Sequence, residues 1–180
     1  MKNDLLWVSI VALLPIFATD SVSAQERANH EVRASPNAGV SQTIGMTIVN
    51  VGYGRPGVKG RKVFGELQKF GDVWRAGANE ATTISVSEDV KIEGQSLAAG
   101  TYSFYLIPFE NDAWTVIINN HVDWGMQYHE DEDVLRFSVT PQPGPKQEWL
   151  QYRFEDLSRT SATLIMHWDT VVLPIRIEIM

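Results

Sequence analysis

The chain has 180 residues, with 22 acidic and 15 basic side chains and no cysteine. Its net charge of −7 argues against general binding to nucleic acid or to anionic membranes, since both attract basic proteins. The lack of cysteine excludes a lipoprotein anchor, a thiol nucleophile and a cysteine-ligated metal.

The first 24 residues have the pattern of a secretory signal peptide. Lys2 gives a weakly basic start, and residues 5–17 form an apolar run that is short for a membrane span. The small residues Val22 and Ala24 then suit signal cleavage. We expect export to the periplasm or the cell exterior, with no stable membrane insertion after cleavage. The alternative is a short membrane anchor.

Residues 25–40 are polar and aperiodic, which predicts a flexible leader before one domain at residues 41–180. In this domain, apolar and polar side chains alternate as in strands. The apolar sets are Ile44, Met46 and Ile48; Ile84 and Val86; Val90 and Ile92; Tyr102, Phe104 and Leu106; Trp114, Val116 and Ile118; Leu135, Phe137 and Val139; Leu150, Tyr152 and Phe154; Leu164, Met166 and Trp168; and Ile175, Ile177 and Ile179. Eight or nine strands with one buried face each predict an all-β fold, an antiparallel, jelly-roll-like β-sandwich.

Only one segment has a helical pattern. Between residues 62 and 70, apolar side chains recur at the spacing of a helix face: Val63, Phe64, Leu67 and Phe70. We therefore expect one short helix near residues 62–70, which the glycine within it weakens.

Residues 54–80 stand out from the rest of the domain. They contain six glycines and six basic side chains against three acidic ones. Glycines concentrate where the backbone needs a positive φ or approaches another group closely. A basic patch on an acidic protein suits a small anionic ligand, and it suits a structural network of ion pairs equally well.

The first half of this segment has the composition of a phosphate-binding loop but lacks the GxxxxGK[ST] spacing. Anion binding by Arg55, Lys59 and Arg61 is one interpretation. Pro56 and the glycines around it fit a simple pair of turns as well, so both interpretations stay open.

The second half brings together residue types that recognise ligands. Trp74 offers an apolar ring, Arg75 a fork of five donors, Asn79 an amide and Glu80 a carboxylate. Together they suit a polar ligand. In the alternative, Arg75 and Glu80 form a buried ion pair that closes the loop and is purely structural.

Other chemistries have less support. His121, Asp123 and His129 are metal-ligand types, but their spacing matches no standard zinc motif, and we expect no metal and no cofactor. Trp124, in a predicted loop, is free to stack on a ligand. No nucleophile motif is present. A hydrolase would instead depend on Glu80 as general acid/base, with Arg75 as stabiliser and a second carboxylate such as Asp123 or Glu130.

Several blocks of the chain, GRPGVKGRKVFG, VWRAGANEATT and DVKIEGQSLAAGTYSFYLIP, resemble the bacterial domain-of-unknown-function family 2911. The similarity covers about residues 41–180. It implies an exported, all-β domain, and it assigns no activity and no catalytic residue. The signature blocks include Arg55, Lys59, Gly60, Arg61, Trp74, Arg75, Gly77, Asn79 and Glu80.

We therefore expect an exported, non-catalytic module that binds a small anionic or hydroxylated, saccharide-like ligand. The candidate contacts are Arg55, Lys59, Arg61, Trp74, Arg75, Asn79, Glu80 and Trp124. The alternatives are a hydrolase-type enzyme and a structural envelope or interaction domain. No pattern in the sequence indicates an oligomeric state.

Overall fold

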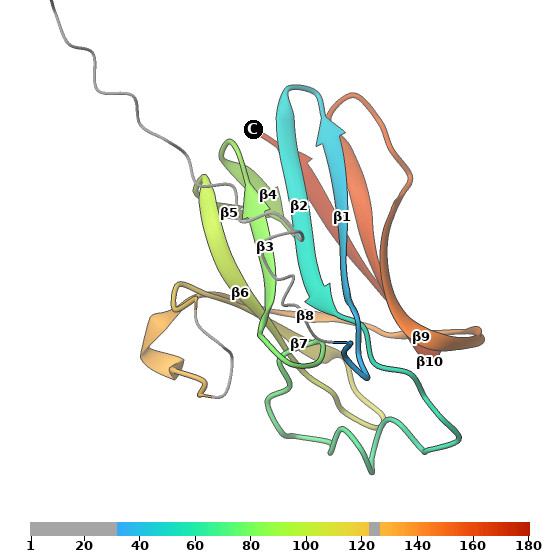
Figure 1. Ribbon diagram of the computed structural model, residues 1–180. Coiled ribbons are helices and arrows are strands. Elements are labelled where there is room, and N and C mark those ends of the chain that lie inside the picture. Colours follow the sequence, from blue (N-terminus) through green and yellow to red (C-terminus); the bar gives the residue numbers. More distant parts are fainter. Residues whose placement is uncertain (1–31, 123–126) are drawn as a thin grey trace, which may run out of the picture.

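The computed structural model describes residues 32–122 and 127–180, which form two antiparallel sheets packed face to face (Figure 1). The six-stranded sheet has the order β1 (Asn37–Ile44), β2 (Thr47–Gly54), β3 (Thr82–Val86), β6 (Gly100–Ile107), β7 (Trp114–Asn119) and β8 (Asp133–Val139). The four-stranded sheet has the order β5 (Gln95–Leu97), β4 (Val90–Ile92), β10 (Ser161–Ile179) and β9 (Gln142–Glu155). The prediction of an all-β sandwich is confirmed, with ten strands in the described residues.

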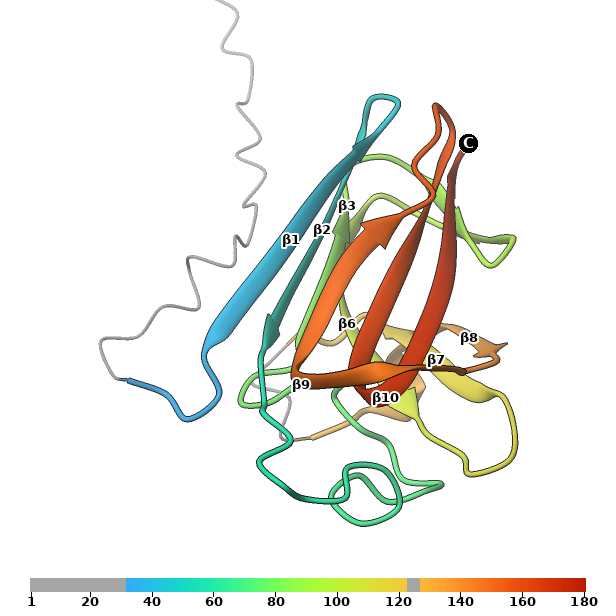
Figure 2. The ribbon, with the colours of Figure 1, turned by 90° about the vertical axis from the view of Figure 1, so that its right-hand side faces the viewer.

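Chain neighbours are mostly sheet neighbours, so the six-stranded sheet is a meander, more sequential than a jelly roll. The β4–β5 hairpin leaves this sheet and joins the other one. β10 is a single strand of 19 residues, although the sequence pattern predicts two. Register shifts on either side of Asp169, which has a φ of +54°, disturb its pairing with β9. Figure 2 shows β9 and β10 bending at the lower end of the sandwich.

The core between the sheets ends in a cluster of aromatic rings. Trp74 and Trp168 are stacked, with 5.5 Å between their ring centroids. Phe64 packs edge-on against both of them and against Trp114. Phe64 and Trp74 belong to the long connection between β2 and β3, so this connection closes one end of the core.

The short helix expected near residues 62–70 does not form. Gly65 has a φ of +93°, outside the helical range, and its N–H bonds to the carbonyl oxygen of Gln68. Val63 and Phe64 still reach the core, but from a tight turn. The described residues contain one 3₁₀ turn, η1 (Glu130–Glu132), and no helix long and apolar enough to cross a membrane.

The predicted inward face of β2 is wrong. A two-residue turn, Gly45 and Met46, joins Ile44 directly to Thr47, and Gly45 has the positive φ that such a turn needs. These two residues interrupt the alternation of inward and outward side chains. In the next strand, the residues predicted to face the core therefore face outward, and their neighbours face the core. Thr47 and Val49 therefore face the core, whereas Met46 is 92% exposed and Ile48 is 43% exposed.

The flexible leader predicted at residues 25–40 is too long, because its last residues belong to the first strand. β1 begins at Asn37, and the residues just before it already bond to other parts of the domain. The sequence misses this because the strand begins with small and polar residues. The predicted signal peptide and residues 25–31 lie outside the described residues.

Candidate functional site

The segment that connects β2 to β3, residues 55–81, spans one end of the sandwich, and we call it the bridging loop (Figure 1). Near its start, it bonds to β9, since Val58 donates to Glu148 and Leu150 donates to Pro56. Near its end, Trp74 and Leu106 of β6 exchange two backbone hydrogen bonds of 2.7 and 2.8 Å. The bridging loop is therefore attached to both sheets.

Close contacts with neighbouring groups account for two of the glycines in and next to the loop. A Cβ on Gly54 would lie 1.9 Å from the carbonyl oxygen of Ala78, and one on Gly77 would lie 2.6 Å from the Thr82 hydroxyl. The N–H of Ala78 also donates to the carbonyl oxygen of Gly54. The end of β2 and the turn that follows Arg75 are therefore packed backbone against backbone.

This turn holds non-glycine residues in a strained conformation. Ala76 and Asn79 have φ values of +53° and +64°, where such residues cost about 1–3 kcal/mol each. The carbonyl oxygen of Ala76 accepts hydrogen bonds from the hydroxyls of Thr82 and Tyr152, at 3.0 and 2.8 Å. Burial raises the pKa of Tyr152 well above its usual value, so this donor stays protonated. The turn is thus fixed from two strands.

The side chain of Arg75, immediately before this turn, has no partner among the described residues. Its Nε is buried without a hydrogen-bond acceptor, and its guanidinium forms no side-chain hydrogen bond or ion pair within residues 32–122 and 127–180. A buried donor without an acceptor costs about 1–3 kcal/mol, and more when it is charged. The only other such atom in the described residues is Nε1 of Trp168, a neutral indole in the aromatic cluster.

Arg75 lies on the outer side of the six-stranded sheet. Trp74 faces the core from its bridge with Leu106, and neighbouring side chains in extended backbone point to opposite faces. The same register brings Arg75 next to Tyr105, which belongs to the apolar cluster on the outer face of the sheet. The sequence pattern assigned no role to Tyr105.

A second apolar cluster lies on this outer face. Its buried members are Ala81, Tyr105, Ile107 and Ile117, with Phe109 and Tyr128 packed against them. The rings of Tyr105 and Tyr128 meet edge to face at 5.2 Å. Tyr128 donates a hydrogen bond of 2.5 Å to Asp133, and burial together with this carboxylate raises the pKa of Tyr128. A largely buried aromatic and apolar cluster thus lies next to the Arg75 side of the sheet.

Glu80 is paired with Arg33 and not with Arg75. Both carboxylate oxygens of Glu80 lie within 2.8 Å of Nη1 of Arg33. The two side chains are 12% and 13% exposed. The alternative of a buried ion pair between Arg75 and Glu80 is therefore wrong, because Glu80 pairs with Arg33. Arg33 was overlooked because it precedes the strands, in the segment expected to be a flexible leader.

Arg55 and Asn79 also bond within the protein. Nε of Arg55 donates to the carbonyl oxygen of Leu150 at 2.8 Å, and its backbone N–H donates to Pro36. The Asn79 amide donates to the carbonyl oxygen of Ser35 at 2.9 Å. These two side chains therefore tie the bridging loop to β9 and to the segment before β1.

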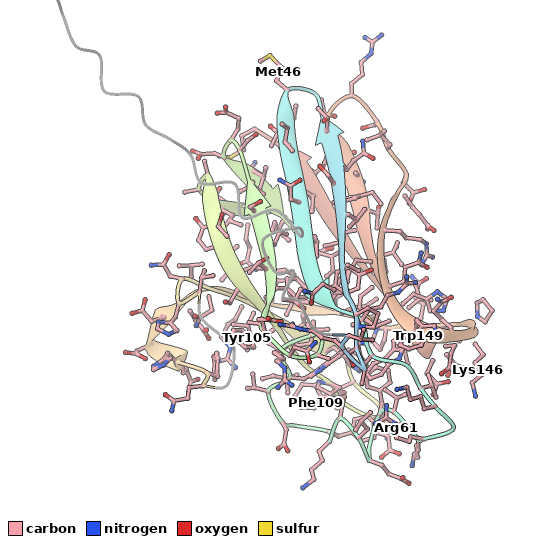
Figure 3. The ribbon with its side chains drawn as sticks, viewed as in Figure 1. Met46, Arg61, Tyr105, Phe109, Lys146 and Trp149 are labelled. Atoms are coloured by element: carbon pink, nitrogen blue, oxygen red, sulfur yellow. The ribbon has the colours of Figure 1, made fainter. Side chains whose placement is uncertain are left out.

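Lys59 and Arg61 hold the first turns of the bridging loop. Arg61 donates to the carbonyl oxygens of Gly57 and Val58 at 2.6 and 3.0 Å. The backbone N–H of Lys59 donates to the Glu148 carboxylate, and its ammonium lies 5.7 Å from the centre of the Trp149 ring. Figure 3 shows Arg61 and Trp149 at this lower end of the molecule.

Of the two candidate tryptophans, only Trp74 lies within the described residues. Trp74 is 5% exposed, stacks on Trp168 inside the core, and donates from Nε1 to the carbonyl oxygen of Gly77. This burial leaves little of its ring for a ligand. Trp124 lies outside the described residues, as does Asp123.

The histidine pair is close but does not complete a metal site. The rings of His121 and His129 are 4.3 Å apart and tilted by 49°. No group of three histidine or carboxylate side chains that could hold a metal ion occurs in residues 32–122 and 127–180. Glu130, a candidate second carboxylate for a hydrolase, pairs with Arg136 at 2.7 Å.

Comparisons with known proteins give one match. A family model described as "Protein of unknown function (DUF2911)" matches residues 35–177, nearly the whole sandwich. No curated protein and no solved structure matches the chain.

Proposed function

The chain belongs to the DUF2911 family of proteins of unknown function, and we propose that it is an exported, non-catalytic module that binds a small anionic ligand through Arg75. The observation that carries this proposal is the unpartnered guanidinium. Among the candidate side chains in the described residues, Arg75 alone has no hydrogen bond, ion pair or ring contact.

The surroundings of Arg75 suit recognition of an anion. A guanidinium binds a carboxylate or a phosphate through parallel hydrogen bonds and stays charged at any physiological pH. The strained turn at Ala76 and the attachment of the loop to both sheets hold the backbone of Arg75 in place before a ligand arrives. A site that is already ordered loses less entropy on binding.

The neighbouring aromatic cluster suits a ligand with an apolar or ring-shaped part next to its acidic group. Tyr105, beside Arg75 in the sheet, is itself buried, but Phe109 and Tyr128, which pack against the same cluster, are only partly buried and leave ring surface for a ligand. Aromatic rings pack well against the apolar faces of sugars and other rings. We therefore favour an acidic saccharide or a small carboxylic acid as the ligand class.

The pairing of Glu80 argues against the hydrolase alternative. A general acid/base must exchange a proton with a substrate, but both oxygens of Glu80 already accept hydrogen bonds from Arg33. This pair has the features of a structural contact, since its side chains are largely removed from solvent.

A thermal-shift and calorimetric screen tests the proposal. The probes are inorganic phosphate, citrate and glucuronate, with glucose as the uncharged counterpart of glucuronate. We expect binding of at least one anion to the wild type and an affinity about 10- to 100-fold lower for Arg75→Ala, as for the loss of one to two charged hydrogen bonds. Lys69→Ala is the matched control, because it removes an exposed positive charge from the same loop.

Two outcomes would overturn the proposal. One is equal binding of the anion to Arg75→Ala and to the wild type. The other is a large loss of stability in Arg75→Ala while no anion binds to the wild type or to either variant. That result would favour the structural alternative. Export is tested separately, by locating the full chain in cell fractions. Retention of the chain in the cytoplasm would contradict that part.

A further inference from the structure

The free edges of the two sheets differ in their protection. An unpaired edge strand exposes a row of N–H and C=O groups to any other strand, so proteins usually block it with proline, charge, bulges or shortness. Here the six-stranded sheet ends at β1 and β8, and the four-stranded sheet ends at β5 and β9.

Three of these edges are protected. β5 has only three residues. β9 contains Pro143 and Pro145, which lack an N–H, and its residues 148–150 already bond to the bridging loop. β8 carries Asp133 and Arg136, so another strand would have to pair next to charged side chains.

The β1 edge has none of these features. The strand has eight residues and pairs with β2 in a register without a bulge. It contains no proline, and residues 34–54, which include all of β1 and β2, contain no charged side chain. A long, uncharged and regular edge of this kind is a template for strand pairing.

The hairpin geometry shows which groups this edge presents. Ile44 and Thr47 flank the two-residue turn and bond to each other. Hydrogen bonds to β2 then alternate along the strand, so Gly39, Ser41 and Thr43 direct their backbone groups away from β2. Their N–H groups have no partner in the part of the chain that the structure describes. The Thr43 carbonyl accepts one bond, from the half-buried side chain of Gln42.

We propose that β1 pairs with β1 of a second copy of the chain, antiparallel and around a twofold axis. The strand suits a copy of itself, because no like charges meet across the axis. With Ser41 opposite the second copy's Ser41, Gly39 lies opposite the second copy's Thr43, and about six backbone hydrogen bonds form. Ala38 and Val40 are only partly buried at the rim of the core, and the added strand buries them further.

This pairing joins the two six-stranded sheets into one continuous sheet. It leaves the bridging loop of each copy at its own end of the sandwich, so it is independent of the proposed ligand site. Because one strand pair buries a modest area, we expect a dimer that dissociates on dilution.

Sedimentation velocity on the protein purified from its producing cells, over a dilution series, tests this proposal. The wild type should change from two-chain to one-chain mass on dilution. Ser41→Lys places like charges directly opposite each other at the axis, and Thr43→Lys adds a positive charge on either side of it, so both variants should be monomeric at every concentration. Ser138→Lys, at an exposed position of β8, should behave as the wild type. A monomeric wild type would overturn the proposal, and so would dimers that persist in both β1 variants.

Cysteine cross-linking tests the register. Because the chain has no cysteine, Ser41→Cys introduces a single thiol. Opposed Cα atoms in a hydrogen-bonded pair lie about 5.5 Å apart, within the range for a disulfide. We expect Ser41→Cys to form a covalent dimer under mild oxidation, and Ser138→Cys to remain largely monomeric. Equal cross-linking of both variants would overturn the pairing around Ser41.

Discussion

The hydroxyl of Tyr152 donates a hydrogen bond to the carbonyl oxygen of Ala76, 2.8 Å away, and so connects β9 to the strained turn of the bridging loop. The same carbonyl oxygen accepts a bond from Thr82 at the start of β3. Elements from both sheets therefore fix the backbone just after Arg75.

Replacement of Tyr152 by phenylalanine tests this connection. We expect a loss of about 1 kcal/mol in the free energy of unfolding, as for one buried hydrogen bond. Amide hydrogen exchange should also become faster in residues 75–80. Urea unfolding and exchange measurements check both effects. Tyr102→Phe is the matched control, because its hydroxyl bonds to Ala98, far along the chain from the bridging loop. Equal exchange changes in both variants would contradict the role of Tyr152.

The pair of Arg33 and Glu80 should stabilise the domain more than the surface pairs do. Glu80→Gln removes the negative charge that pairs with Arg33 in a site that is 13% exposed, and we expect a loss of about 2–3 kcal/mol. Glu178→Gln breaks the solvent-exposed pair with Arg176 and should cost less than about 0.5 kcal/mol. Urea unfolding of both variants checks the contrast. Equal losses would show that Arg33 and Glu80 interact no more strongly than an exposed pair.

How much of this structure can be predicted from the sequence depends on whether the interactions that determine a feature are local along the chain. Alternation of apolar residues identifies the sandwich, because burial of one strand face is a local property. The outward face of Ile48 was missed, because a two-residue turn exchanges the faces without changing composition. The helix near residues 62–70 was wrong, because Gly65 adopts a positive φ that the apolar spacing does not reveal.

The composition of residues 54–80 marks this segment as unusual, but the partners of its side chains could not be predicted. The partner of Glu80 is 47 positions away in sequence, and that of Arg55 is 95 positions away. Such pairs depend on how the sheets pack, which a single sequence does not encode in a readable pattern. The isolation of Arg75 follows from the same fact, because its expected partner is taken by Arg33.

Gly54 should be the least replaceable glycine of the segment. A Cβ there would lie 1.9 Å from a backbone oxygen, so the strand and the turn after Arg75 would have to separate. We expect Gly54→Ala to cost more than about 3 kcal/mol, or to prevent folding. Gly60→Ala is the control, because a Cβ there meets nothing within 4 Å and only the φ of +71° is unfavourable, at about 1 kcal/mol. Thermal unfolding distinguishes them, and similar losses would contradict the close contact of Gly54 with Ala78.

The domain should lose stability at alkaline pH through its tyrosines. Burial raises the pKa values of Tyr53, Tyr102, Tyr128 and Tyr152 above the usual 10, and Asp133 raises that of Tyr128 further. A group whose pKa is higher in the folded state binds its proton more tightly there. Its contribution is therefore complete below the unfolded pKa of about 10 and is lost as the pH rises above that value.

We expect the free energy of unfolding to decrease above about pH 10, and phenolate absorbance to develop together with unfolding rather than before it. Tyr128→Phe should make this decrease shallower, because it removes one proton that the folded state retains. It should also lower stability at neutral pH through the lost bond to Asp133. Urea unfolding as a function of pH checks both effects, and an unchanged alkaline slope in Tyr128→Phe would contradict the raised pKa of Tyr128.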